Sequence, residues 1–168
     1  MVQGTHGWIL HLMGRTAEAI EINEETIRMH EDFQPGYVML GLAYEAAQRY
    51  EKAIQSFETA YAMDSRPVAL AAAGHTFGVW KKEGKARQII RRLTTLAQTE
   101  PVSSYFLALV QIGLGEEEDA ISYLGDAQRE NCDWLIQLGV DPRWKPLHGH
   151  QKFRRLLQRV GLALANQK

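Results

Sequence analysis

Apolar and small residues recur along most of the chain at helical spacing, and this pattern itself repeats after about 34 residues. Gly7 and Gly41 are 34 residues apart, and so are Ala19 and Ala53. Glycine and proline interrupt the pattern where helices are expected to end or begin. The pattern predicts helix pairs near residues 2–13 with 16–30, 36–47 with 51–63, 67–81 with 84–98, and 102–113 with 117–129.

The third pair departs from this spacing. Gly74 and Gly84 are ten residues apart, whereas Gly7 and Gly14 are seven residues apart. If these glycines are equivalent, three extra residues lie near Trp80. We therefore expect a longer first helix or a longer turn in this pair.

The second pair contains the clearest motif in the chain. Its residues resemble the tetratricopeptide repeat pattern at Tyr37, Leu40, Gly41, Ala43, Tyr44, Tyr50, Ala53, Phe57 and Ala60. This resemblance implies an all-α fold, an α-solenoid of antiparallel helix pairs with a C-terminal capping helix. We expect four repeats at about 1–33, 34–67, 68–100 and 101–130, followed by a tail of short helix, turn and capping helix over 131–168.

The tail does not follow the period. Residues Gln151–Leu164 are amphipathic, with an apolar stripe that includes Phe153, Leu157 and Leu164, and they fit a capping helix. Together with the Asp141–Leu147 segment, the tail resembles the C-terminal end of bacterial tetratricopeptide proteins, in which the array often follows a regulatory effector domain. The resemblance implies an effector upstream in a longer protein.

The repeat register places one set of side chains on the first helix of each pair. First helices line the concave side of such an array, where an apolar surface suits a partner peptide. The expected groove residues are Trp8, His11, Val38, Leu42, Glu45, His75, Tyr105, Leu109 and Ile112. The alternative is that neighbouring helices or a second copy of the chain cover them. For Trp80, Trp134 and Trp144 we expect packing between repeats or against the cap.

The sequence gives little indication of catalysis, metal binding or nucleic-acid binding. No nucleophile or phosphate-loop motif occurs, so we expect no catalytic activity, no cofactor and no metal. His148 and His150 match no strong zinc pattern, and the only cysteine is Cys132. A basic cluster around Lys81–Arg92 is read as a solvated helix face rather than a nucleic-acid site, because no aromatic residues interleave with it.

Charge is nearly balanced over the 168 residues, with a net charge of −1. Residues 1–80 carry 10 acidic and 5 basic side chains, and residues 81–168 carry 10 acidic and 14 basic ones. An array of repeats would turn this gradient into an acidic end and a basic end. No signal sequence or membrane span is visible, so we expect a cytoplasmic protein. The expected function is protein or peptide binding; the alternative is a ligand-sensing or self-association module, such as a homodimer, that switches an upstream effector.

Overall fold

The computed structural model of the protein describes residues 2–162, with side chains from His6 onward. Within that range the chain forms nine α-helices, two 3₁₀ helices and no strand, so the all-α prediction is confirmed. The eight helices of the array are α1 (Val2–Leu12), α2 (Thr16–Met29), α3 (Gln34–Ala46), α4 (Tyr50–Asp64), α5 (Pro67–Val79), α6 (Glu83–Leu96), α7 (Ser104–Leu114) and α8 (Glu117–Arg129). The tail contains the 3₁₀ helices η1 (Asp133–Gly139) and η2 (Pro142–Gly149), then α9 (Gln151–Arg159).

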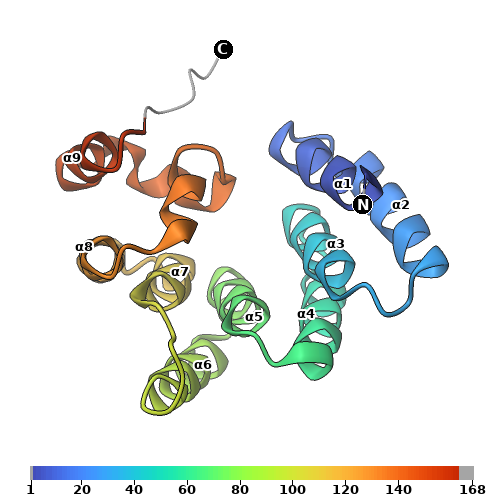
Figure 1. Ribbon diagram of the computed structural model, residues 1–168, viewed down its shortest axis with the longest axis horizontal. Helices are drawn as coiled ribbons and strands as arrows, with labels where there is room; N and C mark the ends of the chain where they lie inside the picture. The colour runs from blue at the N-terminus through green and yellow to red at the C-terminus, as the bar shows by residue number, and fades with distance from the viewer. Residues whose placement is uncertain (1, 163–168) are drawn as a thin grey trace.

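The helices follow one another around an open arc, which is the expected α-solenoid (Figure 1). Helices α1, α3, α5 and α7 lie on the inner side of the arc, and each contacts the next of these along the array. Helices α2, α4, α6 and α8 lie on the outer side (Figure 1). The inner helices therefore form a concave surface.

Small residues allow the two helices of a pair to approach closely. Ala19, Ala53, Ala86 and Ala120 lie near the start of the four outer helices, and none is exposed. On the inner helix α3, a Cβ atom at Gly41 would lie 2.5 Å from the ring of Phe57 on α4. A methyl group has no room there, so the repeated small residues are a packing requirement.

The turn between the two helices of a pair uses one residue with positive φ. This residue is Gly14, Gln48, Lys81 and Gly115 in the four pairs, with φ of 73°, 57°, 61° and 81°. The expectation of three extra residues in the third pair is wrong, because the equivalent of Gly14 is Lys81 and Gly84 lies inside α6. Helix α5 has 13 residues, as α3 has, and no insertion is present.

The tail folds back against the end of the array. The 3₁₀ segments lie on the inner side of the arc, and η2 contacts α7 (Figure 1). Trp144 on η2 is fully buried and donates its indole N–H to the Tyr105 hydroxyl at 3.3 Å. Helix α9 buries Phe153 and Leu157 of the expected stripe, whereas Leu164 lies outside the described residues.

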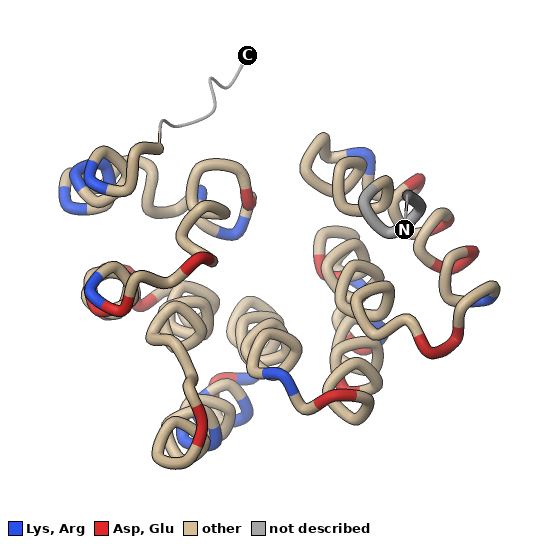
Figure 2. Tube along the Cα trace, viewed as in Figure 1, with Lys and Arg blue, Asp and Glu red and all other residues tan. Residues whose placement is uncertain are grey.

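Charged side chains are distributed unevenly over this arc. Basic residues gather on the outer helix α6 and on α9, and acidic residues are frequent on α2 (Figure 2). On α8 the first turn carries Glu117, Glu118 and Asp119, where negative charge complements the positive end of the helix dipole. The inner helices carry few charges (Figure 2).

Candidate functional site

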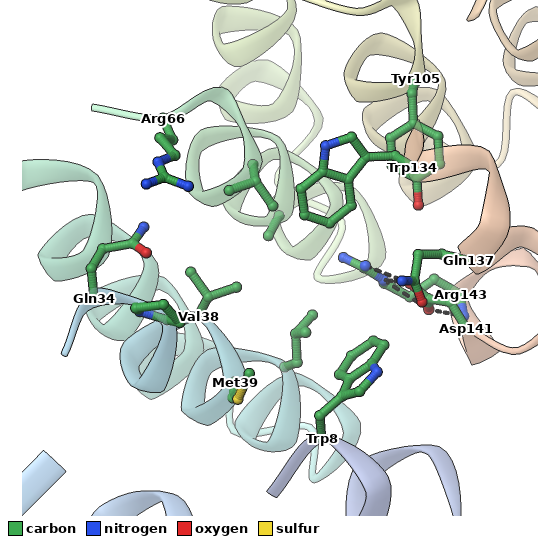
Figure 3. A pocket seen from close by; sticks show the side chains of 14 residues that line it. Trp8, Gln34, Val38, Met39, Arg66, Tyr105, Trp134, Gln137, Asp141 and Arg143 are labelled. Atoms are coloured by element: carbon green, nitrogen blue, oxygen red, sulfur yellow. Dashed lines mark hydrogen bonds and ion pairs between the residues drawn. The ribbon is translucent and has the colours of Figure 1, made fainter. Parts of the chain in front are cut away.

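A cavity of about 280 Å³ opens on the concave side, between the inner helices and the tail (Figure 3). Its array side is formed by Trp8 on α1, Val38 and Leu42 on α3, and Val68 on α5. Its lining is mainly apolar, which is typical of sites that bind ligands or partner side chains.

Aromatic rings frame this cavity. Trp134 on η1 is 41% exposed, and its ring stacks on Tyr105 of α7 at 6.1 Å between centroids. Trp8 stacks on His11 at 5.4 Å. In Figure 3 the rings of Trp8 and Trp134 lie on either side of the guanidinium of Arg143. A rigid aromatic frame of this kind presents a large apolar contact area.

The polar wall of the cavity is an ion pair within the tail. Arg143 donates from Nε to both carboxylate oxygens of Asp141 at 3.0 Å, and from Nη2 to Oδ2 at 2.5 Å. The Asp141 side chain has no exposed surface, and the Arg143 side chain is 11% exposed. Burial alone would raise the pKa of Asp141, but the Arg143 guanidinium outweighs it and holds the pKa below its usual value.

A second polar cluster, formed by residues outside the cavity lining, connects α3 and α5. The Nδ1 atom of His75 lies 2.9 Å from Oε2 of Glu45, and the Thr76 hydroxyl donates to the same oxygen. Burial opposes the charge on Glu45, yet His75 and Arg143 together keep its pKa below the usual value. These contacts join α3 to α5, so they stabilise the array.

The structure thus divides the nine expected groove residues into two groups. Those that line the cavity are Trp8, Val38, Leu42 and Tyr105. Those that lie outside its lining are His11, Glu45, His75, Leu109 and Ile112. Leu109 is 1% exposed and Ile112 is 5% exposed. These two lie on α7, which the tail contacts, and they belong to the core.

His11 is the least satisfied member of the second group. It is 5% exposed, and neither ring nitrogen has a hydrogen-bond partner among the residues that the structure describes. Burial lowers the pKa of His11, and the positive charge of Arg143 lowers it further. A neutral imidazole stacked on Trp8 is the form that this environment favours.

Sequence reasoning missed the contribution of the tail. Trp134, Asp141 and Arg143 line the cavity, although the pattern indicated only packing for Trp134 and a turn-rich link around Asp141. One local signal was present: Asp141 precedes Pro142, and its Oδ1 accepts from the Arg143 backbone N–H at 3.0 Å as a helix cap. That signal predicts a turn, but not where the turn packs.

The two histidines considered as metal ligands, His148 and His150, each contact a nearby side chain. His150 Nε2 lies 3.5 Å from a Glu117 oxygen, and the His148 ring stacks on Phe153 at 6.0 Å. Over residues 2–162, no group of three or more His, Cys, Asp or Glu side chains is placed to hold a metal ion. In the same range no helix combines the length and the apolar character needed to cross a membrane.

Comparison with known families matches one segment of the chain to a repeat family. The model of the family described as the tetratricopeptide repeat matches residues 35–67, which contain nearly all of α3 and the whole of α4. No curated protein matches the chain. The matched segment includes Val38 and Leu42 of the cavity, and the tail lies outside it.

Proposed function

Because the chain is a tetratricopeptide repeat protein, we propose that it binds a segment of a partner protein in the concave cavity between α1, α3, α5 and the tail. Such repeats serve in general as protein-interaction scaffolds and are typically non-catalytic. The observation that carries the proposal is the apolar cavity itself, with the half-exposed indole of Trp134 at its edge.

The size of the cavity limits what enters it. The cavity of about 280 Å³ lies at the small end of the range of about 300–1,000 Å³ that is typical of ligand pockets. We propose that the partner inserts one large apolar side chain as an anchor while its backbone stays in the open groove. Anchors of this kind supply most of the binding energy in many interfaces.

The test uses random dodecapeptides displayed with a blocked C-terminus, selected on the full chain. A selected peptide is then synthesised and its affinity measured for wild type, for Val38→Glu and for Trp134→Ser. Both changes are expected to weaken binding about 30-fold or more, the effect of losing a hot-spot contact worth about 2 kcal/mol. Circular dichroism checks that each variant keeps its helices.

Met63→Glu is the matched control, since Met63 is 39% exposed and lies outside the cavity lining. It adds the same charge at an exposed apolar position and should leave the affinity unchanged. Equal loss in all three variants would contradict the cavity as the site. Leu42 and Leu109 are 5% and 1% exposed, so charges there would disrupt the core and are unsuitable.

We propose no direct nucleic-acid contact. The basic side chains at the start of α6 and directly before it are partly engaged by the protein: Lys82 lies over Trp80 and Lys85 over Phe77, each 5.1 Å from the ring centroid. Arg87 pairs with Glu116 at 2.5 Å. These contacts support the interpretation of α6 as a solvated outer face. Gel-shift measurements at low salt with a duplex and a single strand would detect binding if it occurs.

The wider context is also a proposal. We propose four repeats at about 1–33, 34–67, 68–100 and 101–130, in a bacterial regulatory protein of the cytoplasm whose effector lies upstream. The second candidate function is self-association that switches this effector. Exposed apolar side chains on α1 and in the turn after it, Ile9 at 47% and Met13 at 63%, favour it. Light scattering across a concentration series, with and without the selected peptide, separates a homodimer from a peptide-binding monomer.

A further inference from the structure

The unpaired polar atoms of the cavity wall share one property. Two buried polar atoms of its lining residues, Arg143 Nη1 and Gln34 Nε2, have no hydrogen-bond partner within residues 6–162. Both atoms are donors. They lie on opposite sides of the cavity, Gln34 on α3 and Arg143 in the tail (Figure 3). Buried donors are usually paired, so the unpaired donor of Arg143 indicates an acceptor on the bound molecule at the tail side.

The charged residues that line the cavity also favour an acceptor on the bound molecule. The ionised side chains that line the cavity are Arg66, Arg143 and Asp141. Both oxygens of Asp141 already accept from Arg143, and its side chain has no exposed surface. A bound group therefore meets the guanidinium rather than the carboxylate. Figure 3 shows Arg143 reaching into the space between Trp8 and Trp134, with its ion pair to Asp141 on the side of the tail.

Arg66 adds positive charge at the rim. It lies directly before α5, its side chain is 71% exposed, and it lines the cavity opposite the tail. Its Nε atom lies 2.6 Å from an oxygen of Asp64, so its charge is partly balanced. The deep donor is therefore Arg143, and Arg66 supports the same sign of charge at the entrance.

We infer that the segment bound in this cavity carries a carboxylate side chain, from Asp or Glu, within about two residues of its apolar anchor, and that Arg143 binds this carboxylate. The inference rests on the proposed function and names the chemistry of the partner. A carboxylate suits a single guanidinium that is already engaged along one edge. A phosphate group carries nearly two negative charges and three acceptor oxygens, and it would need more donors than this wall offers.

The experiment uses the dodecapeptides selected on the full wild-type chain with a blocked C-terminus. The expected result is enrichment of Asp or Glu close to a bulky apolar residue. One selected sequence is made as an acetylated, amidated peptide, together with its Glu→Gln or Asp→Asn form. Wild type is expected to bind the acidic form about 30-fold more tightly, as for a buried charge pair that loses one partner.

The protein side of the test uses Asp141→Asn with Arg143→Gln, which leaves no unpaired buried charge. This double variant should bind the acidic and amide peptides equally. Arg87→Gln is the matched control, because it removes a guanidinium from the outer helix α6 and should keep the preference. If the double variant does not fold, the two peptides still test the inference on wild type.

The outcomes separate the two proposals. Selection of no peptide at all overturns the proposed function, and the inference falls with it. Selection of apolar anchors without acidic neighbours leaves the proposed function standing and overturns the inference. Equal affinity of the acidic and amide peptides for wild type overturns it as well. If the blocked library yields no binder and a library with free C-termini does, the carboxylate comes from the end of the partner chain, and its side-chain source is overturned.

Discussion

The Asp141–Arg143 ion pair should behave as one energetic unit in the tail. The perturbation is a double-mutant cycle of Asp141→Asn, Arg143→Gln and both together. Arg143→Gln leaves the Asp141 carboxylate buried without a cation, because its side chain has no exposed surface. Breaking a buried pair from one side costs about 3–5 kcal/mol. The double variant replaces the pair with neutral groups of similar shape and should cost much less than the two single changes combined.

The size of the coupling energy between Asp141 and Arg143 follows from their contacts. The pair has three side-chain hydrogen bonds of 2.5–3.0 Å, plus the bond from the Arg143 backbone N–H to Asp141. Groups in such direct contact couple by up to about 3 kcal/mol. We therefore expect a coupling energy of about 2–3 kcal/mol between the two positions.

Urea denaturation measures the cycle, with ellipticity for the whole array. Tryptophan fluorescence reports the tail in a background in which Trp8 and Trp80 are replaced by Phe. Trp134 and Trp144 lie in the tail, so their emission should change at lower urea in the single variants. Repeat proteins can unfold in stages, and separate transitions by the two probes would show that the loss is local. A cost below about 1 kcal/mol for Arg143→Gln would refute the buried pair, since exposed pairs contribute about that much or less.

The same pair makes a prediction about pH. The folded pKa of Asp141 lies below its ordinary value of 3.8, so its stabilisation is fully present above pH 3.8. It is lost as the pH falls through the folded pKa, when the carboxylate becomes protonated. In Asp141→Asn this contribution is absent at every pH. In the background without Trp8 and Trp80, the tail fluorescence should therefore show an acid transition that is smaller when Asp141→Asn is added.

Two further predictions concern packing and turns. A Cβ atom at Gly7 would lie 2.0 Å from Asn23 Oδ1. Gly7→Ala should therefore lower the free energy of unfolding, measured in urea, by about 1–3 kcal/mol, and adding Asn23→Ala should recover most of this loss. If stability does not recover, the clash with Asn23 is not the cause. Lys81 has φ of 61° where the first and fourth turns have glycine, so Lys81→Gly should stabilise the chain by about 0.5–1 kcal/mol in thermal unfolding. The reverse change, Gly115→Lys, should destabilise it, and equal melting temperatures for all three proteins would contradict this reasoning.

Much of the array could be predicted because its determinants are local. The helices of the array begin and end within three residues of the predicted positions, since proline and glycine at the boundaries act on their own neighbours. The predicted spacing of the third pair is wrong because it treats glycine as the marker of the turn. Lys81 adopts the same left-handed conformation with a side chain, and no local pattern marks such a residue. The buried Ala86 was the better marker, because packing between helices requires a small residue there.

The candidate site was predicted only as far as the repeats form it. Trp8, Val38, Leu42 and Tyr105 follow from the register of the inner helices, and all four line the cavity. The pairing of Glu45 with His75 joins residues 30 positions apart, which periodicity does not reveal. Some of the side chains on the inner helices therefore line the cavity, and others are buried under neighbouring helices or the tail. Which of them are buried depends on tertiary packing, which the repeat register does not reveal.

The tail shows where periodic reasoning ends and what the non-periodic part contributes. The inner helices supply an apolar wall with few charges, which offers contact area and little discrimination between apolar partners. The tail adds the indole of Trp134 and the guanidinium of Arg143 to that wall. Because polar groups in an apolar site provide much of its selectivity, we propose that the tail contributes to the choice of partner. Replacing the tail while keeping the array should therefore change which polar residues the selected peptides carry. The apolar anchor residue of these peptides should change less.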